Sequence, residues 1–586
     1  MAPHVRFDDL TPGAGRSFEF VGFSGVVTTT EVAEVAEVLE SVEQATAGGL
    51  WAAGFLCYEA APAFDPAFRV RPPDGGVAGR CPLAWFGLFE ECLPVPPPKP
   101  DGGYTLNDWE PTVMAAHYGA AIAAIKDHIA AGDTYQVNYT FRLRSLLRGN
   151  LQSFYADLIA AQRGAWAAYI DTGSLAIASS SPELFFDLDD GVLTSRPMKG
   201  TARRGRWSAE DLALADGLAN SEKERAENLM IVDLIRNDVG RISAFGSVAV
   251  PSLFDIEQYD TVWQMTSTVT SRLRAEARLS NVFEALFPCG SVTGAPKVRT
   301  MEIIAGLETS PRGPYCGAIG YVAPGGRRAA FNVAIRTAVV DLGSGEVEYG
   351  TGGGITWDST TEGEHAEALA KAMVLTARYP VFDLLETLRW EGVGYSELDR
   401  HMARLEASAA YFRFQFDRKR VLAELETTAA AAGDGVARVR LTLAEDGTPH
   451  AAWTRLEPSP GPVRLVIDDV PIDPSDTMLY HKTTSRGLYE DRLARHPKAD
   501  DVVLVNEAGQ VTETTIANIL ARLDGEWCTP PLDSGCLPGV YREHLLDEGV
   551  IMERRLTPAD LRAADELAVV NSVRLWRSAE LVDTEH

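Results

Sequence analysis

The chain has 586 residues and a formal net charge of −28, because 82 acidic side chains outnumber 54 basic ones. That excess of negative charge argues against binding to a nucleic-acid backbone or to an anionic membrane surface. Hydrophobic residues make up 46% of the chain and charged residues 23%, a globular composition that excludes intrinsic disorder.

No stretch stays apolar for the roughly 20 residues that a membrane-spanning helix needs, so we expect no membrane span. The first residues include Asp8, Asp9 and Glu19 and contain no apolar run, which argues against a secretion signal. The seven cysteines form no CxxC pair and have no histidine-rich cluster beside them. They predict reduced intracellular thiols, and we expect a cytoplasmic protein.

The first predicted domain covers residues 1–380. Within it, the proline-rich stretch Leu93–Pro100 separates an N-terminal segment (1–100) from the region that carries the chemical motifs (110–375). The elements expected in that region are a helix over His117–Ala131, an antiparallel meander with strands at Tyr315–Val322, Ala329–Val340 and Glu346–Tyr349, and a helix over Glu362–Arg378.

The second predicted domain covers residues 381–586 and follows with almost no linker. It begins with a strand over Val381–Trp390 and an amphipathic helix over Asp399–Phe412. The proline-rich stretch Glu457–Pro462 interrupts the pattern, which predicts that this domain consists of two subdomains.

Two pairs of glutamates stand three residues apart on predicted helices of the first domain, Glu224 with Glu227 and Glu364 with Glu367. Like charges at this spacing cost an isolated helix roughly 0.2–0.5 kcal/mol. Two interpretations are open. The pairs either form two solvated acidic faces or converge on a divalent cation such as Mg²⁺, which prefers oxygen ligands.

The glycine run Gly350–Gly354, with Gly352, Gly353 and Gly354 at its end, follows the last predicted strand. Its backbone N–H groups suit a bound anion, although a plain turn explains it equally well. Arg336 is expected on one strand face with Asn332 and Ala334. A guanidinium in an apolar strand needs a planar acceptor, either a substrate carboxylate or an internal acidic partner.

Lys199 lies in the sequence Arg196–Thr201, just after a predicted strand, and Glu183 precedes it by 16 residues. A lysine near carboxylates and a metal ion acts as a nucleophile once proton transfer removes its charge. Most lysines in turns are simply exposed, so the residues alone leave both interpretations open.

Taken together, the motifs between about residues 110 and 375 resemble the chorismate-utilising enzymes, and among them the aminodeoxychorismate synthase subfamily. The resemblance rests on YQVN (135–138), SPE (181–183), PMKGT (197–201), AENLM (226–230), GSVTGAPK (290–297), IRT (335–337) and the helix with Glu364, Glu367 and Lys371.

This resemblance implies that Glu227 and Glu367 bind Mg²⁺, with Glu224 and Glu364 close by. It implies that Lys199 attacks C2 of chorismate and displaces the C4 hydroxyl, so that ammonia enters at C4, while Glu183 serves as acid and base. The groups that would hold the substrate carboxylates are Arg336, Lys297 and the backbone of Gly352, Gly353 and Gly354. We see no Cys-His-Glu glutaminase pattern, so ammonia is expected from a separate glutamine amidotransferase subunit or from solution.

The second domain contains Lys482 between β-branched and aromatic residues, and Glu513 in a β-rich stretch. Arg404 and the turn at Leu537–Tyr541 offer charge and free N–H groups to a phosphate. On its own Lys482 is an ordinary strand-end lysine. Taken in chain order, however, these features resemble the fold-type IV pyridoxal-phosphate enzymes. The matching elements are HMARL (401–405), Lys482, Glu513 to Asn518, TPP (529–531) with LPG (537–539), and Asp565-Glu566 leading into Asn571-Ser572.

The second resemblance implies that Lys482 binds pyridoxal 5′-phosphate covalently and that Glu513 keeps the pyridine nitrogen protonated. The groups that would grip the phosphate are Arg404, the backbone of Val540, and the turn at Ser572 and Val573. One departure concerns the start of the domain. Members usually have an extra strand and a glycine-containing loop before the segment that corresponds to Leu385–Thr387, and here the last helix of the first domain takes that place.

The expected fold class is α+β: a chorismate-binding fold, with antiparallel sheets in a sandwich-like core and surrounding helices, followed by a two-subdomain fold-type IV α/β domain. The expected function is Mg²⁺-dependent amination of chorismate to 4-amino-4-deoxychorismate, then pyridoxal-phosphate-dependent elimination of pyruvate to give 4-aminobenzoate. The alternatives are a second domain that is an amino-acid aminotransferase, or one that is catalytically silent and only mediates interactions. Lys199 disfavours an isochorismate- or salicylate-forming first domain. A homodimer through the second domain is compatible with the sequence.

Overall fold

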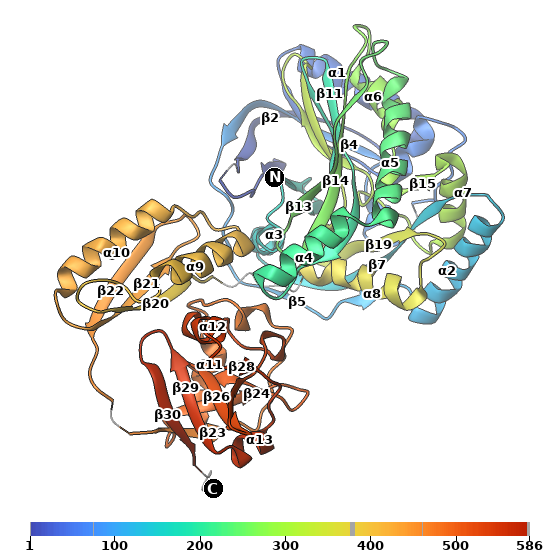
Figure 1. Cartoon of the computed structure of the whole chain (residues 1–586). Helices are drawn as coiled ribbons and strands as arrows, with labels where there is room; N and C mark the ends of the chain where they lie inside the picture. The colour runs from blue at the N-terminus through green and yellow to red at the C-terminus, as the bar shows by residue number, and fades with distance from the viewer. Residues whose placement is uncertain (1, 14, 74, 376–380, 460, 583–586) are drawn as a thin grey trace. The chain divides into compact units, whose positions relative to one another are not determined.

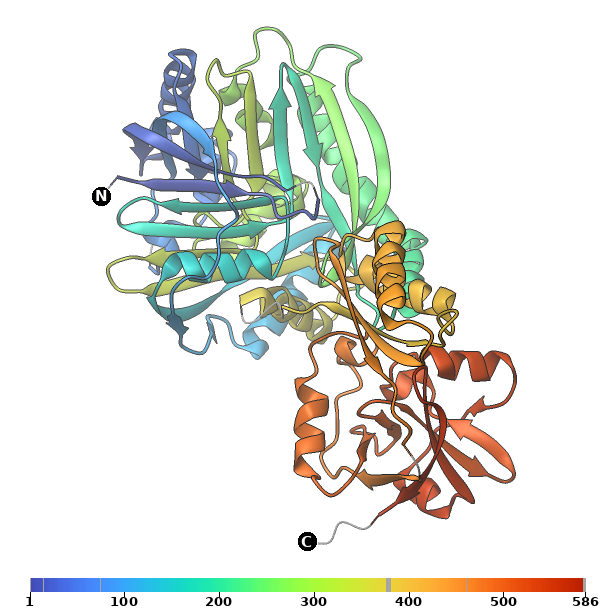
Figure 2. The ribbon, with the colours of Figure 1, turned by 90° about the vertical axis from the view of Figure 1, so that its left-hand side faces the viewer.

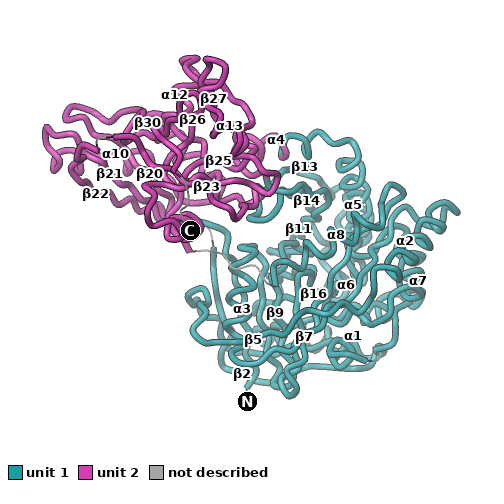
Figure 3. Tube along the Cα trace, turned by 90° about the horizontal axis from the view of Figure 1, so that it is seen from below, with its two compact units in different colours: residues 1–204, 215–379 teal, residues 205–214, 380–586 magenta. Residues whose placement is uncertain are grey.

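The computed structural model describes residues 2–13, 15–73, 75–375, 381–459 and 461–582. The chain forms two compact units (Figure 3): unit 1 is Met1–Arg204 with Ala215–Tyr379, and unit 2 is Gly205–Leu214 with Pro380–His586. The domain boundary predicted between residues 380 and 381 touches residues 376–380, which lie outside the described ones. Among the described residues, no helix combines the length and the hydropathy that crossing a membrane requires.

Unit 1 is built from antiparallel strands that are hydrogen-bonded into one extended network, with helices packed on its faces (Figure 1), as predicted for an α+β protein. Its strands are β1 His4–Asp8, β2 Ser17–Thr29, β3 Trp51–Leu56, β4 Ala84–Pro94, β5 Tyr104–Leu106, β6 Glu110–Pro111, β7 Gln136–Gly149, β8 Trp166–Asp171, β9 Leu175–Ser181, β10 Leu184–Asp189, β11 Val192–Arg196, β12 Met198–Arg203, β13 Ala249–Gln258, β14 Val262–Arg272, β15 Gly294–Ala295, β16 Ala318–Val322, β17 Arg328–Val333, β18 Thr337–Asp341 and β19 Glu346–Ile355.

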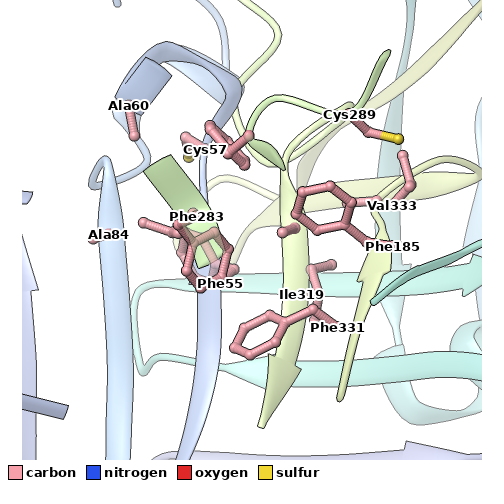
Figure 4. Close-up of a cluster of buried hydrophobic side chains, with 14 of the residues drawn as sticks. Phe55, Cys57, Ala60, Ala84, Phe185, Phe283, Cys289, Ile319, Phe331 and Val333 are labelled. Atoms are coloured by element: carbon pink, nitrogen blue, oxygen red, sulfur yellow. The ribbon is translucent and has the colours of Figure 1, made fainter. Parts of the chain in front are cut away.

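The helices of unit 1 cover two hydrophobic cores. The larger core lies between the strands and helices α1 and α6, and Figure 4 shows Phe55, Phe185, Phe283 and Phe331 packed in it. The second core joins β7 and β19 to helices α2, α3 and α8. The helix bounds are α1 Val35–Ala47, α2 Ala115–Ala130, α3 Leu151–Ala160, α5 Glu222–Gly240, α6 Leu279–Leu286, α7 Lys297–Leu307 and α8 Thr361–Ala372.

The glycine run lies inside strand β19, whereas the sequence placed it after a shorter strand and left open an anion-binding backbone or a plain turn. A Cβ atom on Gly350 would come within 2.3 Å of the Tyr315 ring, and one on Gly352 within 2.2 Å of the Tyr139 carbonyl oxygen. Tyr315 and the neighbouring strand β7 therefore leave no room for side chains at these two positions of β19. The glycines serve a close backbone approach in a strand, not a change of chain direction.

The strand predicted over Ala329–Val340 is in fact two strands, β17 and β18. They are separated at Arg336, whose φ of 51° is left-handed. The break follows from pairing: β17 pairs with β10 and β16, while β18 pairs with β9 and β19. Arg336 is consequently not on a strand face with Asn332 and Ala334, and that expectation was wrong.

Two other expected elements are shorter than predicted. The strand predicted over Tyr315–Val322 begins at Ala318 as β16. The helix predicted over Glu362–Arg378 is α8, which is followed by a short 3₁₀ turn over Met373–Leu375. The remainder of that prediction lies outside the described residues.

Unit 2 contains two sheets on either side of the proline-rich stretch, in agreement with the predicted two-subdomain fold. The first sheet has the antiparallel order β20-β21-β22, and α9 and α10 pack on one face of it (Figures 1 and 2). The second sheet is mixed, with the order β25-β24-β23-β30-β29-β26-β27-β28. The bounds are β20 Leu384–Trp390, α9 Leu398–Phe412, α10 Arg418–Ala432, β21 Ala437–Leu443, β22 Pro449–Arg455, β23 Val463–Ile467, α11 Gly487–Arg495, β24 Asp501–Val505, β25 Val511–Thr514, β26 Asn518–Leu523, β27 Glu526–Thr529, α12 Val540–Asp547, β28 Met552–Glu553, α13 Pro558–Ala563, β29 Glu566–Asn571 and β30 Leu575–Leu581.

A short segment from the middle of the chain, residues 205–214, packs as part of unit 2. The Tyr411 hydroxyl donates a hydrogen bond to the Gly205 carbonyl oxygen at 2.7 Å. The Trp207 ring lies 5.2 Å from the Tyr480 ring, centroid to centroid. Helix α4 (Ser208–Ala219) starts in this segment and ends in residues assigned to unit 1.

Two candidate active sites

A cavity of about 210 Å³ in unit 1 collects the acidic pairs that the sequence singled out. Glu224 and Glu227 reach it from α5, and Glu364 and Glu367 reach it from α8. Lys199, on β12, lines the same cavity. Residues far apart in the sequence therefore meet around one space.

Two lysines neutralise part of this negative charge. The Lys199 ammonium lies 3.2 Å from Glu227 Oε2, and the Lys371 ammonium lies 2.9 Å from Glu367 Oε1. Within the described ranges, no three His, Cys, Asp or Glu side chains are grouped closely enough to hold a metal ion. The four glutamates share a cavity without forming a closed coordination cage.

The pKa values of these glutamates reflect burial and mutual repulsion. Burial raises the pKa of Glu224, and the charge of Glu227 raises it further. Burial also raises the pKa of Glu364, although the Ser359 hydroxyl donates to it at 2.6 Å. Burial opposes ionisation of Glu367 as well, but the Lys371 ammonium outweighs it and lowers the pKa of this carboxyl. An added cation would relieve the repulsion at this site.

Glu183 lies between β9 and β10 and is buried at the wall of the same cavity. The Ser291 hydroxyl donates to its Oε1 at 2.7 Å. Burial raises the pKa of Glu183 to about 7. A carboxyl with that pKa exists in both protonation states near neutrality, as an acid–base catalyst requires.

Arg336 also lines the cavity, and its guanidinium donates to the Gln162 side-chain oxygen. Burial lowers its pKa. In the part of the chain that the structure describes, no carboxylate lies within ion-pair distance of Arg336. A half-buried cation whose protein partner is a neutral amide is a suitable site for an anionic substrate group.

One of the groups expected to hold substrate carboxylates, Lys297, lies elsewhere. The Lys297 ammonium donates to Asp238 at 3.0 Å and to the Leu286 carbonyl oxygen at 3.1 Å. It does not line the cavity, because this ion pair between α7 and α5 holds it away. Gly352 and Gly354 line the cavity, and an ideal Cβ on Gly353 would lie 3.1 Å from Glu364 Oε2, so Gly353 faces the same acidic group. We therefore withdraw Lys297 from the substrate-binding set.

Gln136 belongs to the YQVN motif, but the sequence predicted no role for it. Its side chain is fully buried, and neither of its amide atoms has a hydrogen-bond partner. An ideal Cβ on Gly354 would lie 2.5 Å from Gln136 Nε2 and 2.7 Å from Lys199 Nζ, so both groups face the same glycine. Polar and apolar residues alternate at the start of β7, where Asn138 and Thr140 follow Gln136, so the pattern does not single out Gln136.

A second cavity, of about 620 Å³, lies in unit 2. It is lined by every residue that the sequence predicted for this domain: Lys482, Glu513, Arg404, Val540, Ser572 and Val573. Lys482 follows the short 3₁₀ turn Thr477–Leu479, and burial, with help from Arg404 and Arg486, lowers its pKa to about 8. A lysine of this kind loses its proton close to neutral pH and becomes a nucleophile or base.

Glu513 is on β25, and three groups donate to its carboxylate. The Tyr489 hydroxyl lies 2.9 Å from Oε1, while the Leu537 N–H and the Asn518 amide lie 3.2 Å and 3.5 Å from Oε2. Burial nevertheless raises the pKa of Glu513 to about 7. This buried carboxylate faces the cavity that Lys482 also lines.

Arg404 is fixed by the neighbouring sheet. Its guanidinium donates to both oxygens of Glu386, at 2.9 Å and 2.7 Å, and to the Pro538 carbonyl oxygen at 3.0 Å. Burial works against ionisation of Glu386, but Arg404 and then His401 outweigh it and lower its pKa to about 2. His401 is fully buried against Glu386, so it is a packing residue.

The two halves match two known families. Residues 7–377 match the family described as chorismate binding enzyme, and residues 383–582 match the family described as amino-transferase class IV, whose fold implies pyridoxal phosphate. Component 1 of aminodeoxychorismate synthase from Escherichia coli K12 is 40% identical over 275 residues, which cover 47% of this chain and 60% of that protein. The match thus spans less than two thirds of that relative.

The chain is also similar to solved structures. Anthranilate synthase component I from Streptococcus pneumoniae TIGR4 aligns over 62% of this chain and 93% of its own, with a TM-score of 0.55 and 25% identity. A putative 4-amino-4-deoxychorismate lyase from Legionella pneumophila aligns over 35% of this chain and 84% of its own, with a TM-score of 0.31 and 22% identity. The family matches confirm both resemblances that the motifs indicated.

Proposed function

Because the chain belongs to the family of chorismate binding enzymes, we propose that unit 1 aminates chorismate to 4-amino-4-deoxychorismate and that unit 2 removes pyruvate from it to give 4-aminobenzoate. The observation that carries the proposal is Lys199, whose amine stands in the acidic cavity 3.2 Å from Glu227. That position suits a nucleophile that masks C2 of the substrate while ammonia enters at C4.

The substrate is a dicarboxylate, and the cavity offers it cationic and backbone partners. Arg336 is a half-buried guanidinium with no protein carboxylate within ion-pair distance among the described residues, so a substrate carboxylate would complete its environment. The side-chain-free backbone of Gly352 and Gly354 lets the substrate approach β19 closely. The unpaired amide of Gln136 adds a donor and an acceptor beside Lys199.

The donor set of the cavity fits Mg²⁺, because carboxylate oxygens are the ligands this ion prefers. Glu227 and Glu367 would bind it, with Glu224 and Glu364 close by. Both proposed ligands already attract a cation, since each forms an ion pair with a lysine. The ion would supply positive charge that holds an anionic oxygen of the substrate.

The chain's own groups then divide the reaction between them. The Lys199 amine, once it has lost its proton, forms a bond to C2 while the C4–oxygen bond breaks. Glu183 donates its proton to the departing hydroxyl, as its pKa of about 7 allows. Ammonia forms the new bond at C4, and the bond between Lys199 and C2 breaks in the same displacement.

The acid role of Glu183 predicts a pH dependence of the amination rate. Glu183 must be protonated to donate, so the rate should fall as the pH rises through about 7, the pKa that burial gives this group. A Glu183→Gln variant should lose that falling limb and about 10²–10⁴ in rate, the usual share of general acid catalysis. The rate should be measured at a fixed concentration of unprotonated ammonia. A variant that keeps the wild-type falling limb would contradict the assignment.

The residues of the second cavity fit pyridoxal phosphate. Lys482 is a half-buried amine with a pKa of about 8, and Glu513 is a buried carboxylate facing the same cavity. Arg404, the first N–H of α12 at Val540, and the turn at Ser572 and Val573 would hold the phosphate. When bound, the cofactor supplies an electron sink for carbanion charge.

The lysine of this cavity would also move the proton of the elimination. Lys482 would take the proton from C4 of the substrate and return it to the departing enolpyruvyl group. The wall adds Arg438 and Arg440, which suits an anionic substrate. An amino-acid aminotransferase is the alternative for this domain, and it predicts amino transfer that depends on 2-oxoglutarate.

The domain limits and partners belong to the same proposal. Residues 1–380 would form the synthase domain and residues 381–586 the lyase domain. Ammonia would come from a separate glutamine amidotransferase subunit, and the second domain would form a homodimer. Both reactions would take place in the cytoplasm.

One incubation tests the proposal. The purified protein is mixed with chorismate, Mg²⁺ and ammonium, and the products are separated by chromatography. We expect 4-aminobenzoate and pyruvate in equal amounts. Anthranilate as the main product would overturn the assignment of unit 1. Accumulated 4-amino-4-deoxychorismate would show that unit 2 is not a lyase, and added 2-oxoglutarate then reveals an aminotransferase.

A further inference from the structure

Tyr489 holds one oxygen of the buried carboxylate in the second cavity. It is on α11, seven residues after Lys482, and its hydroxyl donates to Glu513 Oε1 at 2.9 Å. The other oxygen, Oε2, accepts from the Leu537 N–H at 3.2 Å. Tyr489 and Glu513 both line the cavity. Donors on both oxygens fix the orientation of the carboxylate before any ligand binds.

Arg486 strengthens this arrangement through its contact with the tyrosine ring. Its guanidinium carbon lies 4.6 Å from the Tyr489 ring centroid, and the group also donates to the Thr515 carbonyl oxygen. A cation over an aromatic face is attracted by the ring electrons and draws electron density from the hydroxyl. The Tyr489 hydroxyl becomes a better hydrogen-bond donor as a result.

The protonation states favour donation from tyrosine to carboxylate. Burial, followed by the neighbouring charge of Glu513, raises the pKa of Tyr489 well above its ordinary value, so the hydroxyl keeps its proton. Burial raises the pKa of Glu513 to about 7, and the Tyr489 hydrogen bond opposes that rise. A hydrogen bond to the charged form favours the charged form.

We propose that Tyr489 is a positioning residue that keeps Glu513 ionised and aimed at the ring nitrogen of pyridoxal phosphate. The proposal rests on the cofactor assignment within the proposed function, and it assigns Tyr489 a role that the motifs did not. A neutral Glu513 would offer no charge to a protonated ring nitrogen, so the cofactor would bind less tightly.

The surroundings of the pair matter for any pH-dependent measurement. Among the described residues, the charged or titratable groups that act on Glu513 and Tyr489 are Lys482, Arg486, Cys536 and Asp476. Lys482 and Arg486 favour the ionised carboxylate, and burial raises the pKa of Cys536 to about 12, so this thiol stays neutral. Glu513 is then the group expected to change charge around pH 7, and Lys482, whose pKa is about 8, follows at slightly higher pH.

The test measures the affinity of the full-length protein for pyridoxal phosphate in Tyr489→Phe, by titrating cofactor-free protein and following the visible absorbance of the bound cofactor. Loss of one hydrogen bond to a charged group should weaken binding by about 10-fold or more. Without the hydroxyl the pKa of Glu513 rises further, so the loss should be larger below pH 7 than above it. Tyr395→Phe is the matched control, because its hydroxyl donates to the Leu425 carbonyl oxygen in the other subdomain.

A double-mutant cycle separates positioning from mere packing. In a Glu513→Gln background, adding Tyr489→Phe should cause almost no further loss of affinity, because the hydroxyl acts through the carboxylate. Arg486→Leu should give a smaller loss with the same pH trend, and it provides a second variant if Tyr489→Phe folds poorly. Wild-type affinity at every pH, or a full additional loss in the Glu513→Gln background, would overturn the proposal.

Cofactor affinity does not depend on which reaction unit 2 catalyses. If the chromatographic assay yields no 4-aminobenzoate but the cycle shows coupling, the role of Tyr489 stands and the proposed reaction fails. If the protein binds no pyridoxal phosphate at all, both fail together, and the product assay reports this independently.

Discussion

Replacing Lys199 by alanine should abolish the formation of both 4-amino-4-deoxychorismate and 4-aminobenzoate. The Lys199 amine lies in the acidic cavity, with its side chain only 16% exposed and its nitrogen 3.2 Å from Glu227. In the proposed reaction this amine masks C2 while ammonia enters at C4. Loss of a covalent nucleophile commonly lowers the rate by about 10⁴–10⁶-fold. The measurement is the product profile after incubation with chorismate, Mg²⁺ and ammonium.

Lys223 offers a control that removes the same charge near the same carboxylate. Its ammonium lies 4.0 Å from Glu227 Oε1, but its side chain is 53% exposed at the start of α5. Exposed ion pairs contribute little, typically below about 1 kcal/mol. Lys223→Ala should therefore change the amination rate by only a few fold. Equal losses in the two variants would mean that Lys199 matters for its charge and not for its nucleophilic amine.

Replacing Lys482 by alanine should stop the reaction at the aminated intermediate. Chorismate should still disappear at the wild-type rate, because unit 1 is unchanged. Neither pyruvate nor 4-aminobenzoate should accumulate. The Lys482 amine, with its pKa of about 8, is the group that we assign to cofactor attachment and to proton transfer. A time course by chromatography, with pyruvate measured separately, follows both steps in one experiment.

Lys498→Ala is the matched control, since this lysine lies on the exposed surface of the same unit. It should leave the whole time course unchanged. If Lys482→Ala also produced 4-aminobenzoate at the wild-type rate, the elimination would not proceed through this lysine. If chorismate consumption stopped as well, the variant would have damaged more than the second site, and thermal melting would show it.

The acidic helices and the second cavity could be predicted from sequence because their signals are local. Glu224 and Glu227 are one helical turn apart on α5, and Glu364 and Glu367 repeat that spacing on α8. Ordered family motifs then supplied what spacing could not, namely that both pairs face one cavity. In unit 2, the ordered motifs likewise indicated the residues around the cofactor, and these residues all line one cavity.

Partnerships between distant segments could not be predicted. The residues from 329 to 340 have a continuous strand-like pattern, and only the different neighbours of β17 and β18 force the left-handed turn at Arg336. Lys297 lies in a family motif, yet its ammonium forms an ion pair with Asp238, which is 59 residues earlier in the chain. Tyr489 was missed because an aromatic residue on a short amphipathic helix is usually a packing residue.

The segment at 205–214 has a practical consequence for dissecting this chain into separately expressed halves. The backbone passes from one unit to the other at three points, 204/205, 214/215 and 379/380. A polypeptide that stops at residue 379 still carries Trp207, but it lacks the tyrosine ring that covers it. Such a fragment would leave the indole without its tyrosine partner. Substitution of Lys199 or of Lys482 in the full chain is therefore a better way to isolate each catalytic activity than truncation.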